Sequence, residues 1–231
     1  MDDVDRVVRD LVRRTLEAAR AAGPDAVAPI VQAGHPVLRT VAAPYDGQLD
    51  GDELTELLAL MRRTMLAAPG VGLAAPQIGL PLALAVLEDP GSGDDEVALA
   101  RERTALPYRV LVNPAYAPAD AAPAAFYEGC LSVVGYQAVV ARARSVHLTG
   151  LDEAGRALDE VVTGWSARIV QHETDHLRGT LYLDRALPRS LSATDAWGAH
   201  WGSEPDPREA ARALGFELPG TARRGAGEEP R

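Results

Sequence analysis

The chain has 231 residues, of which 47% are hydrophobic and 24% are charged. This composition is typical of one compact domain with short extensions, and it excludes collagenous and disordered classes. Acidic residues outnumber basic ones by 33 to 23, and the net charge of −10 disfavours a general nucleic-acid binder. No stretch has the roughly 20 consecutive apolar residues that a membrane span requires.

The basic residues are all arginines, which excludes Schiff-base lysines and P-loop chemistry. Cys130 is the single cysteine, so an internal disulfide is excluded and a reducing compartment is favoured. The first residues are acidic, whereas export signals begin with basic residues. We therefore expect a cytoplasmic protein.

The chain divides into three predicted parts. Residues 1–27 form an N-terminal extension, in which apolar positions over 4–22 recur at helical spacing and predict an amphipathic helix. Acidic residues dilute its basic face, so we expect it to dock on the domain or on a partner rather than on a membrane. Residues 28–191 form the main domain. Residues 192–231 form a C-terminal extension with a short helix over 207–214 and a disordered end.

The main domain contains two further predicted helices, over residues 52–66 and 165–177. A turn-rich segment, 152–156, joins two strand-like runs as a hairpin, and the polar segment 88–104 is predicted to be a surface loop. Strands outnumber helices and do not alternate with them, which favours an α+β fold with a mainly antiparallel sheet. The predicted strands are 83–87, 109–112, 138–141, 146–149 and 158–162.

An H-E-x-x-H motif lies inside the third predicted helix of the chain. Residues four apart share a helix face, so His172 and His176 can bind one metal ion while Glu173 beside them handles the proton of a water. This arrangement is typical of zinc hydrolases. The alternative is a helix with two surface histidines that bind nothing.

A catalytic metal usually has three protein ligands and one open position, so a third ligand is expected elsewhere in the chain. Cys130 is the candidate, because a thiolate is a strong ligand for a borderline-soft ion. A cysteine considered alone is more often a small buried apolar residue. The histidine pair therefore decides the interpretation of Cys130.

Residues 70–77 form a glycine-rich segment that superficially fits a dinucleotide-binding pattern. The segment follows a helix rather than a strand, and Pro76 interrupts the helix that such a site needs, so this interpretation fails. A loop whose backbone can contact an extended ligand remains, with Gln77 as a side-chain donor. The alternative is a plain turn between a helix and a strand.

Together these segments resemble the three motifs of the peptide deformylase family over about residues 28–188. The resemblance implies a catalytic domain over 28–191 with an antiparallel sheet packed around a central helix that carries H-E-x-x-H. It also implies a metal-dependent hydrolase that removes the formyl group from the N-terminal methionine of newly made proteins. The segments that carry the resemblance are 34–39, 70–77, 128–132, 164–168 and 171–176.

The same resemblance implies that Cys130, His172 and His176 are metal ligands and that Glu173 is the general acid and base. The family usually holds ferrous iron, with zinc or another divalent ion as an alternative. The implied partners are nascent formyl-methionyl polypeptides, with a transient association with the ribosome. No membrane and no sequence-specific nucleic acid is expected as a partner.

The substrate-facing residues are also assigned by resemblance. Gln77 and the backbone N–H of Leu131 would stabilise the oxyanion, while Gly72 and Gly129 would pair with the substrate backbone as a strand is added to a sheet edge. Val134 and Gln137 depart from common family residues, and either change can reshape the groove. The residues expected around the methionine side chain are Val71, Phe126, Trp165 and Ile169.

Three rival interpretations stay open from the residues alone. A zinc endopeptidase shares H-E-x-x-H but usually has His or Glu as the third ligand. A thiol hydrolase would use Cys130 as a nucleophile with a histidine base. A non-catalytic relative that binds nascent chains or ribosomes would be expected to lose Glu173 or a ligand first, and the chain has them all.

Overall fold

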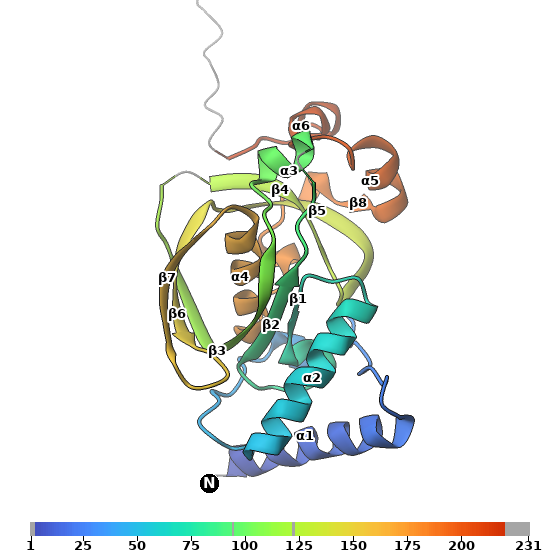
Figure 1. Ribbon diagram of the computed structural model, residues 1–231. Helices are drawn as coiled ribbons and strands as arrows, with labels where there is room; N and C mark the ends of the chain where they lie inside the picture. Colours follow the sequence, from blue (N-terminus) through green and yellow to red (C-terminus); the bar gives the residue numbers. More distant parts are fainter. Residues whose placement is uncertain (1–2, 94, 122, 220–231) are drawn as a thin grey trace, which may run out of the picture.

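Two antiparallel sheets enclose one helix in this computed structural model, which describes residues 3–93, 95–121 and 123–219 (Figure 1). This arrangement confirms the prediction of an α+β fold with a mainly antiparallel sheet. One sheet has the order β1 (Gly72–Ala74), β2 (Leu84–Asp89), β3 (Leu106–Pro118), β6 (Ser145–Leu151), β7 (Ala157–Thr163). The other has the order β4 (Pro123–Cys130), β5 (Val133–Ala143), β8 (Ser192–Ala193).

Helix α4 (Gly164–Leu177) lies inside the curve of the larger sheet (Figure 1). It buries Ile169 and Val170 in an apolar cluster with residues of β2, β3 and β6. Strand β1 approaches this helix so closely that a Cβ atom at Gly72 would lie 2.3 Å from Oε1 of Glu173. A glycine is therefore required where the edge strand meets the helix that carries H-E-x-x-H. This helix is central, as predicted.

Helices α1 (Asp3–Ala22) and α2 (Gly51–Ala67) pack together at the end of the molecule that holds the N-terminus (Figure 1). The apolar face of α1 is buried against α2, so of the two expected docking surfaces, the domain or a partner, the helix contacts the domain. Glu53 closes a capping box with Asp50 at the start of α2 and also binds two arginines of α1. The buried residues that join the helices include Val8, Val12, Leu16, Leu57, Met61 and Met65.

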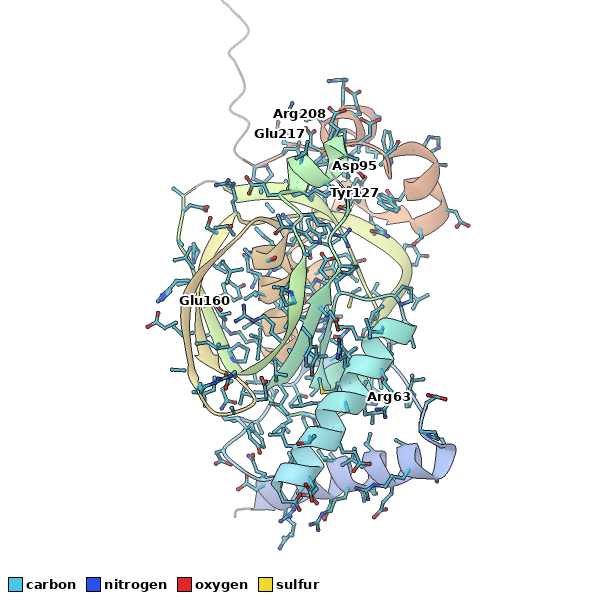
Figure 2. The ribbon with its side chains drawn as sticks, in the orientation of Figure 1. Arg63, Asp95, Tyr127, Glu160, Arg208 and Glu217 are labelled. Carbon is cyan, nitrogen blue, oxygen red and sulfur yellow. The ribbon has the colours of Figure 1, made fainter. Side chains whose placement is uncertain are left out.

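The predicted strands match observed ones, although the strand predicted over 83–87 begins one residue before β2, and the predicted hairpin is the antiparallel pair β6–β7. Glu160 projects outward from β7 (Figure 2). Strands β1 and β4 were not predicted. The remaining helical turns are η1 (Pro36–Arg39), η2 (Ala75–Ile78), η3 (Tyr182–Asp184) and η4 (Pro188–Ser190).

The prediction of a surface loop over 88–104 is wrong in two respects. Strand β2 continues through Asp89, whose buried carboxylate binds both Nε and Nη2 of Arg103 at 2.9 Å. A short helix, α3 (Glu96–Arg101), then follows its N-cap residue Asp95, whose side chain accepts a hydrogen bond from the backbone N–H of Ala98. The polar residues that suggested a surface loop instead form a buried ion pair and cap a helix.

The C-terminal extension packs on the smaller sheet through α5 (Thr194–His200) and α6 (Arg208–Leu214). Trp197, Trp201 and Phe216 cover Tyr127 and Val139, so the short helix predicted over 207–214 belongs to an ordered layer. The end expected to be disordered, residues 220–231, lies outside the described residues. Across the described ranges, no helix combines the length and the apolar character needed to cross a membrane.

Candidate active site

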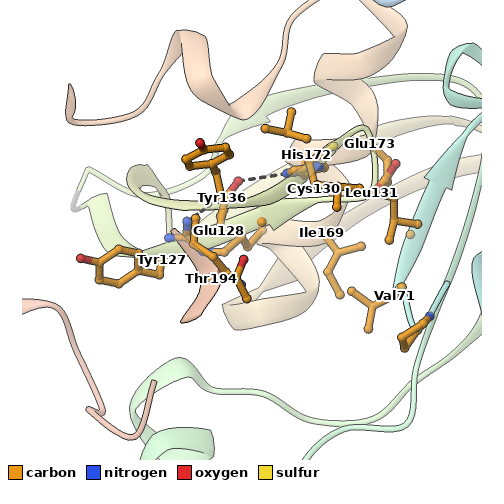
Figure 3. A pocket seen from close by; sticks show the side chains of 18 of the residues that line it. Val71, Tyr127, Glu128, Cys130, Leu131, Tyr136, Ile169, His172, Glu173 and Thr194 are labelled. Carbon is orange, nitrogen blue, oxygen red and sulfur yellow. Dashed lines mark hydrogen bonds and ion pairs between the residues drawn. The ribbon is translucent and has the colours of Figure 1, made fainter. Parts of the chain in front are cut away.

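Three side chains with metal-ligating atoms meet where the end of β4 faces α4; Figure 3 shows two of them, Cys130 and His172. Cys130, His172 and His176 each offer one such atom, and these atoms lie within 4.8 Å of one another. Nε2 of His176 is 3.3 Å from Sγ of Cys130. The structure thus brings together the three residues that the sequence singled out as ligands, although 42 positions separate Cys130 from His172 in the sequence.

Glu128 and Tyr182 hold the imidazole ring of His172 in place. Its Nδ1 atom lies 3.0 Å from Oε2 of Glu128, and the ring of Tyr182 stacks on its ring with centroids 6.2 Å apart. A carboxylate on one imidazole nitrogen fixes the ring orientation and leaves the other nitrogen for a metal ion. Glu128 therefore orients a ligand without belonging to the ligand cluster.

Glu128 is itself part of a buried network of ion pairs. Burial alone would raise the pKa of Glu128, but the guanidinium groups of Arg142 and Arg168 hold it well below its usual range. Arg142 binds Glu128 at 2.6 Å and Asp175 at 2.8 Å, and Arg185 binds Asp175 at 2.7 Å. Each buried charge thus has a partner, and the network fixes α4 against β4 and β5.

Glu173 lies beside the cluster on the inner side of β1. Burial raises the pKa of Glu173 to about 7, against the lowering effect of His172 and Arg142. Its Oε2 atom is buried and has no hydrogen-bond partner among the described residues. A buried carboxyl oxygen without a partner is unfavourable unless another molecule supplies one.

The donor set fits one divalent metal ion. Two imidazoles and a thiolate form a three-ligand set typical of catalytic centres, which leave the fourth position for water or substrate. The unpartnered oxygen of Glu173 lies next to this set. The chemistry and spacing of these donor atoms therefore suit a divalent metal ion.

Gln77 lies at the edge of the same cluster, within the helical turn η2. Its Oε1 accepts a hydrogen bond from the backbone N–H of Ala74 at 2.8 Å, which turns the amide nitrogen towards Cys130 and Ser132. That nitrogen is 3.6 Å from Sγ of Cys130 and 3.4 Å from Oγ of Ser132. Leu131 follows Cys130 directly and lines the same cavity. Gln77 and Leu131 therefore lie next to Cys130, while their role at the oxyanion stays a prediction.

A cavity of about 410 Å³ opens beside the cluster. Gly72 of β1 and Val71 just before it line one wall, and Gly129 of β4 lines another. Trp165 and Ile169 of α4 also face the cavity. The two departures from the family pattern lie here as well. Val134 is 72% exposed at the rim, and a Cβ atom at Gly129 would lie 3.4 Å from the amide of Gln137.

Phe126 does not line this cavity. It faces a smaller one of about 80 Å³ that Trp165 also lines, and the two rings meet edge to face with centroids 6.1 Å apart. Successive residues of a strand point to opposite faces, so Phe126 and its neighbour Tyr127 contact different cavities. Tyr127 lines the larger one.

Several residues that line the larger cavity were missed in the sequence, and three of them come from segments far from the motifs. Arg101 comes from α3, and Thr194 and Trp197 come from α5 in the C-terminal extension. No spacing in the sequence connects these segments to the metal motif. Trp197 and Trp201 are one helical turn apart in the sequence, but this spacing does not connect either residue to the cavity.

A model of the polypeptide deformylase family matches residues 27–191. This chain belongs to the peptide deformylase family. A peptide deformylase 1 from Streptomyces coelicolor is 59% identical over 92% of this chain and 95% of that protein. A peptide deformylase from Bifidobacterium adolescentis is 48% identical over 92% of this chain and 97% of that protein.

Solved peptide deformylase structures share the fold. The Met-Ala-Ser-bound class I type b peptide deformylase from Acinetobacter baumannii matches with a TM-score of 0.63 and 32% identity, over 70% of this chain and 99% of that one. The actinonin complex of a peptide deformylase from Synechococcus elongatus matches with a TM-score of 0.57, 32% identity and coverage of 82% and 86%. The chain is therefore a metal-dependent hydrolase that removes the N-formyl group from nascent polypeptides.

Proposed function

We propose that Cys130, His172 and His176 hold the catalytic metal ion of this deformylase and that Glu173 moves the protons of the reaction. The observation that carries this proposal is the meeting of the three ligand atoms within 4.8 Å, next to a buried Glu173 oxygen that lacks a partner. The family assignment favours this function over a zinc endopeptidase and over a thiol hydrolase.

Hydrolysis of a formamide needs a nucleophile, a stabilised oxyanion and a proton for the leaving amine. A bound divalent ion supplies Lewis-acid activation of water and of the formyl oxygen. Glu173 takes the proton of the attacking water and returns it to the amine of the departing methionine. The amide of Gln77, aligned by Ala74, and the backbone N–H of Leu131 donate to the oxyanion.

The substrate backbone lies between two strand edges in this proposal. Strand β1 is the edge of the larger sheet and β4 is the edge of the smaller one, and both line the cavity. An extended peptide can add to such edges through main-chain hydrogen bonds at Gly72 and Gly129. The methionine side chain then enters the space lined by Val71, Trp165 and Ile169.

We propose ferrous iron as the native ion, because the chain has the cysteine and two histidines by which it resembles a family that usually holds iron. Zinc is the alternative ion. Metal analysis of protein purified without oxygen distinguishes the two. An iron enzyme loses activity in air faster than it unfolds, whereas equal lifetimes with and without oxygen indicate zinc.

Nascent formyl-methionyl chains are the proposed partners, met in the cytoplasm during a transient association with the ribosome. The catalytic domain in this proposal is 28–191, with 1–27 and 192–231 as extensions. The C-terminal extension also contributes to the proposed site, because Thr194 and Trp197 line the cavity.

Removal of one ligand tests the metal assignment. Cys130→Ala and His176→Ala should each lose the ion and the hydrolysis of a formyl-methionyl peptide, since two remaining ligands hold a divalent ion poorly. His147→Ala is the matched control, because this exposed histidine pairs with Asp159 on the outer hairpin. Metal content and deformylation are measured on the same samples. Full metal occupancy in both ligand variants would contradict the assignment.

A further inference from the structure

Three arginines surround Trp165 at the cavity next to the metal ligands. The guanidinium carbons of Arg101, Arg103 and Arg168 lie 5.3, 5.9 and 5.6 Å from the centre of its ring. All three residues line the cavity. Three guanidinium groups thus lie near the ring of Trp165. Because like charges repel, this arrangement is favourable only while each guanidinium group also has a counter-charge or water.

Two of the three charges are balanced inside the protein. Arg168 binds the carboxylate of Glu128, and Arg103 binds the buried carboxylate of Asp89 through two nitrogens. Neither of these guanidinium groups needs a ligand from outside. The arginine from α3 therefore has to be considered separately.

Arg101 has no carboxylate partner in the described ranges, and its Nε atom is buried without a hydrogen-bond acceptor. Burial lowers the pKa of Arg101 most and the neighbouring Arg103 lowers it further, while the more weakly acting carboxylate of Asp95 raises it only in part. A half-buried cation without a counter-ion costs free energy that a bound anion would recover. The cavity thus presents one unbalanced positive charge next to Trp165.

The backbone around Arg101 is held on both sides. Asp95 caps α3, and the ion pair between Arg103 and Asp89 fixes the chain two residues after Arg101. Glu102 has a φ of 50°, and its carbonyl oxygen accepts a hydrogen bond from the backbone N–H of Trp165 at 3.4 Å. Arg101 is therefore presented on a fixed backbone and not on a free loop.

Strand geometry selects the substrate position that can reach this charge. In an extended peptide the side chains of residues 1 and 3 project from the same face, roughly 7 Å apart, while residue 2 projects from the other face. With methionine against Ile169 and Trp165, the third side chain lies further along the same face, where Arg101 flanks Trp165.

We propose that Arg101 binds an acidic side chain at the third position of the formyl-methionyl substrate. The proposal rests on the proposed placement of the peptide between β1 and β4. It makes Arg101 a specificity-determining residue that acts on binding and leaves the chemical step unchanged. Peptides with aspartate or glutamate at position 3 are then better substrates than their amide counterparts.

Matched peptides test this proposal on the metal-loaded full chain at low ionic strength. Formyl-Met-Ala-Asp-amide is compared with formyl-Met-Ala-Asn-amide, and formyl-Met-Asp-Ala-amide with formyl-Met-Asn-Ala-amide. We expect kcat/KM to be about fivefold higher for Asp than for Asn at position 3, through KM, because one partly exposed ion pair contributes on this scale. At position 2 the ratio should be about one.

Three variants assign the preference to Arg101. Arg101→Gln should bring the position 3 ratio to about one, and Arg101→Lys should keep part of it, since the charge remains. Arg156→Gln removes the same charge from an exposed pair with Asp152 on the outer hairpin and should keep the wild-type ratio. Thermal unfolding of each variant shows whether the fold is intact.

The two proposals fail differently in this experiment. Turnover of the neutral peptides reports the deformylase site, whereas the Asp/Asn ratio alone reports Arg101. A wild-type ratio near one at position 3, or a preference that survives in Arg101→Gln, overturns the role of Arg101 while the deformylase function stands.

Discussion

The two ends of the substrate cavity are built in different ways. At the inner end, Glu128 orients His172 beside Cys130 and Glu173, and the buried charges of Glu128 and its arginine partners are paired. At the outer end, α5 contributes the ring of Trp197, and α3 contributes Arg101, which has no carboxylate ion-pair partner among the described residues. In the proposed function, the inner end breaks the bond and the outer end holds the substrate chain. Substitutions at the inner end should therefore change kcat or metal binding, and those at the outer end should change KM.

The largest effect is expected at Glu173. Glu173→Gln should lower kcat by about 10² to 10⁴, because it removes general acid and base catalysis, while KM changes little. The metal should stay bound, since this residue is not among the ligand cluster. Steady-state kinetics and metal content are measured on one preparation. A variant that keeps its metal and more than about a tenth of wild-type kcat would show that another group moves the proton.

A smaller effect is expected one layer behind the ligands. Glu128→Gln should weaken metal affinity by about 10- to 100-fold, because His172 loses the carboxylate that orients it. The variant should also unfold at a lower temperature, since Arg142 keeps its buried charge with one partner fewer. Competition with a chelator gives the affinity. Glu160→Gln, which breaks an exposed pair with Arg109, is the control. If Glu128→Gln bound the metal with unchanged affinity, the ion-pair network would not contribute to metal binding.

The smallest effect is expected at the outer end. Trp197→Ala should raise KM for a formyl-methionyl peptide by about fivefold, since an aromatic contact contributes roughly 1 kcal/mol, and kcat should hold. Trp201→Ala is the matched control, because Trp201 packs in the same apolar cluster but does not line the cavity. An equal rise in KM in both variants would mean that α5 acts through packing alone and that the cavity has no outer binding end.

The sequence predicted what depends on local spacing. His172 and His176 share a helix face because they are four residues apart, and Cys130 was the one available thiol. The amphipathic helix at the start of the chain was also predictable, because its apolar residues recur with the helical period. The positions of these residues could be predicted because they depend on the local sequence pattern.

The sequence failed where long-range contacts decide the structure. Helix α3 is six residues long and would not form alone; it is held by the ion pair of Asp89 with Arg103 and by the contact of Glu102 with Trp165. Strand β4 contains a run of alanine and proline without alternation, and its pairing with β5 defines it. The position of Trp197 at the cavity depends on how the C-terminal extension folds back, which no spacing in the sequence records.

The buried network behind the ligands gives the active site a constant charge background. Its cations are guanidinium groups, which keep their protons at every pH that a cell experiences. The pKa of Glu128 lies well below its value in an unfolded chain, so the stability that this carboxylate adds is present above that value. That stability is lost only as pH falls through the much lower folded pKa. Over the pH range of enzyme assays, the electrostatic field of this network at α4 is therefore constant. As pH falls, the metal ligands should be protonated before the network loses its charges and the packing of α4 weakens.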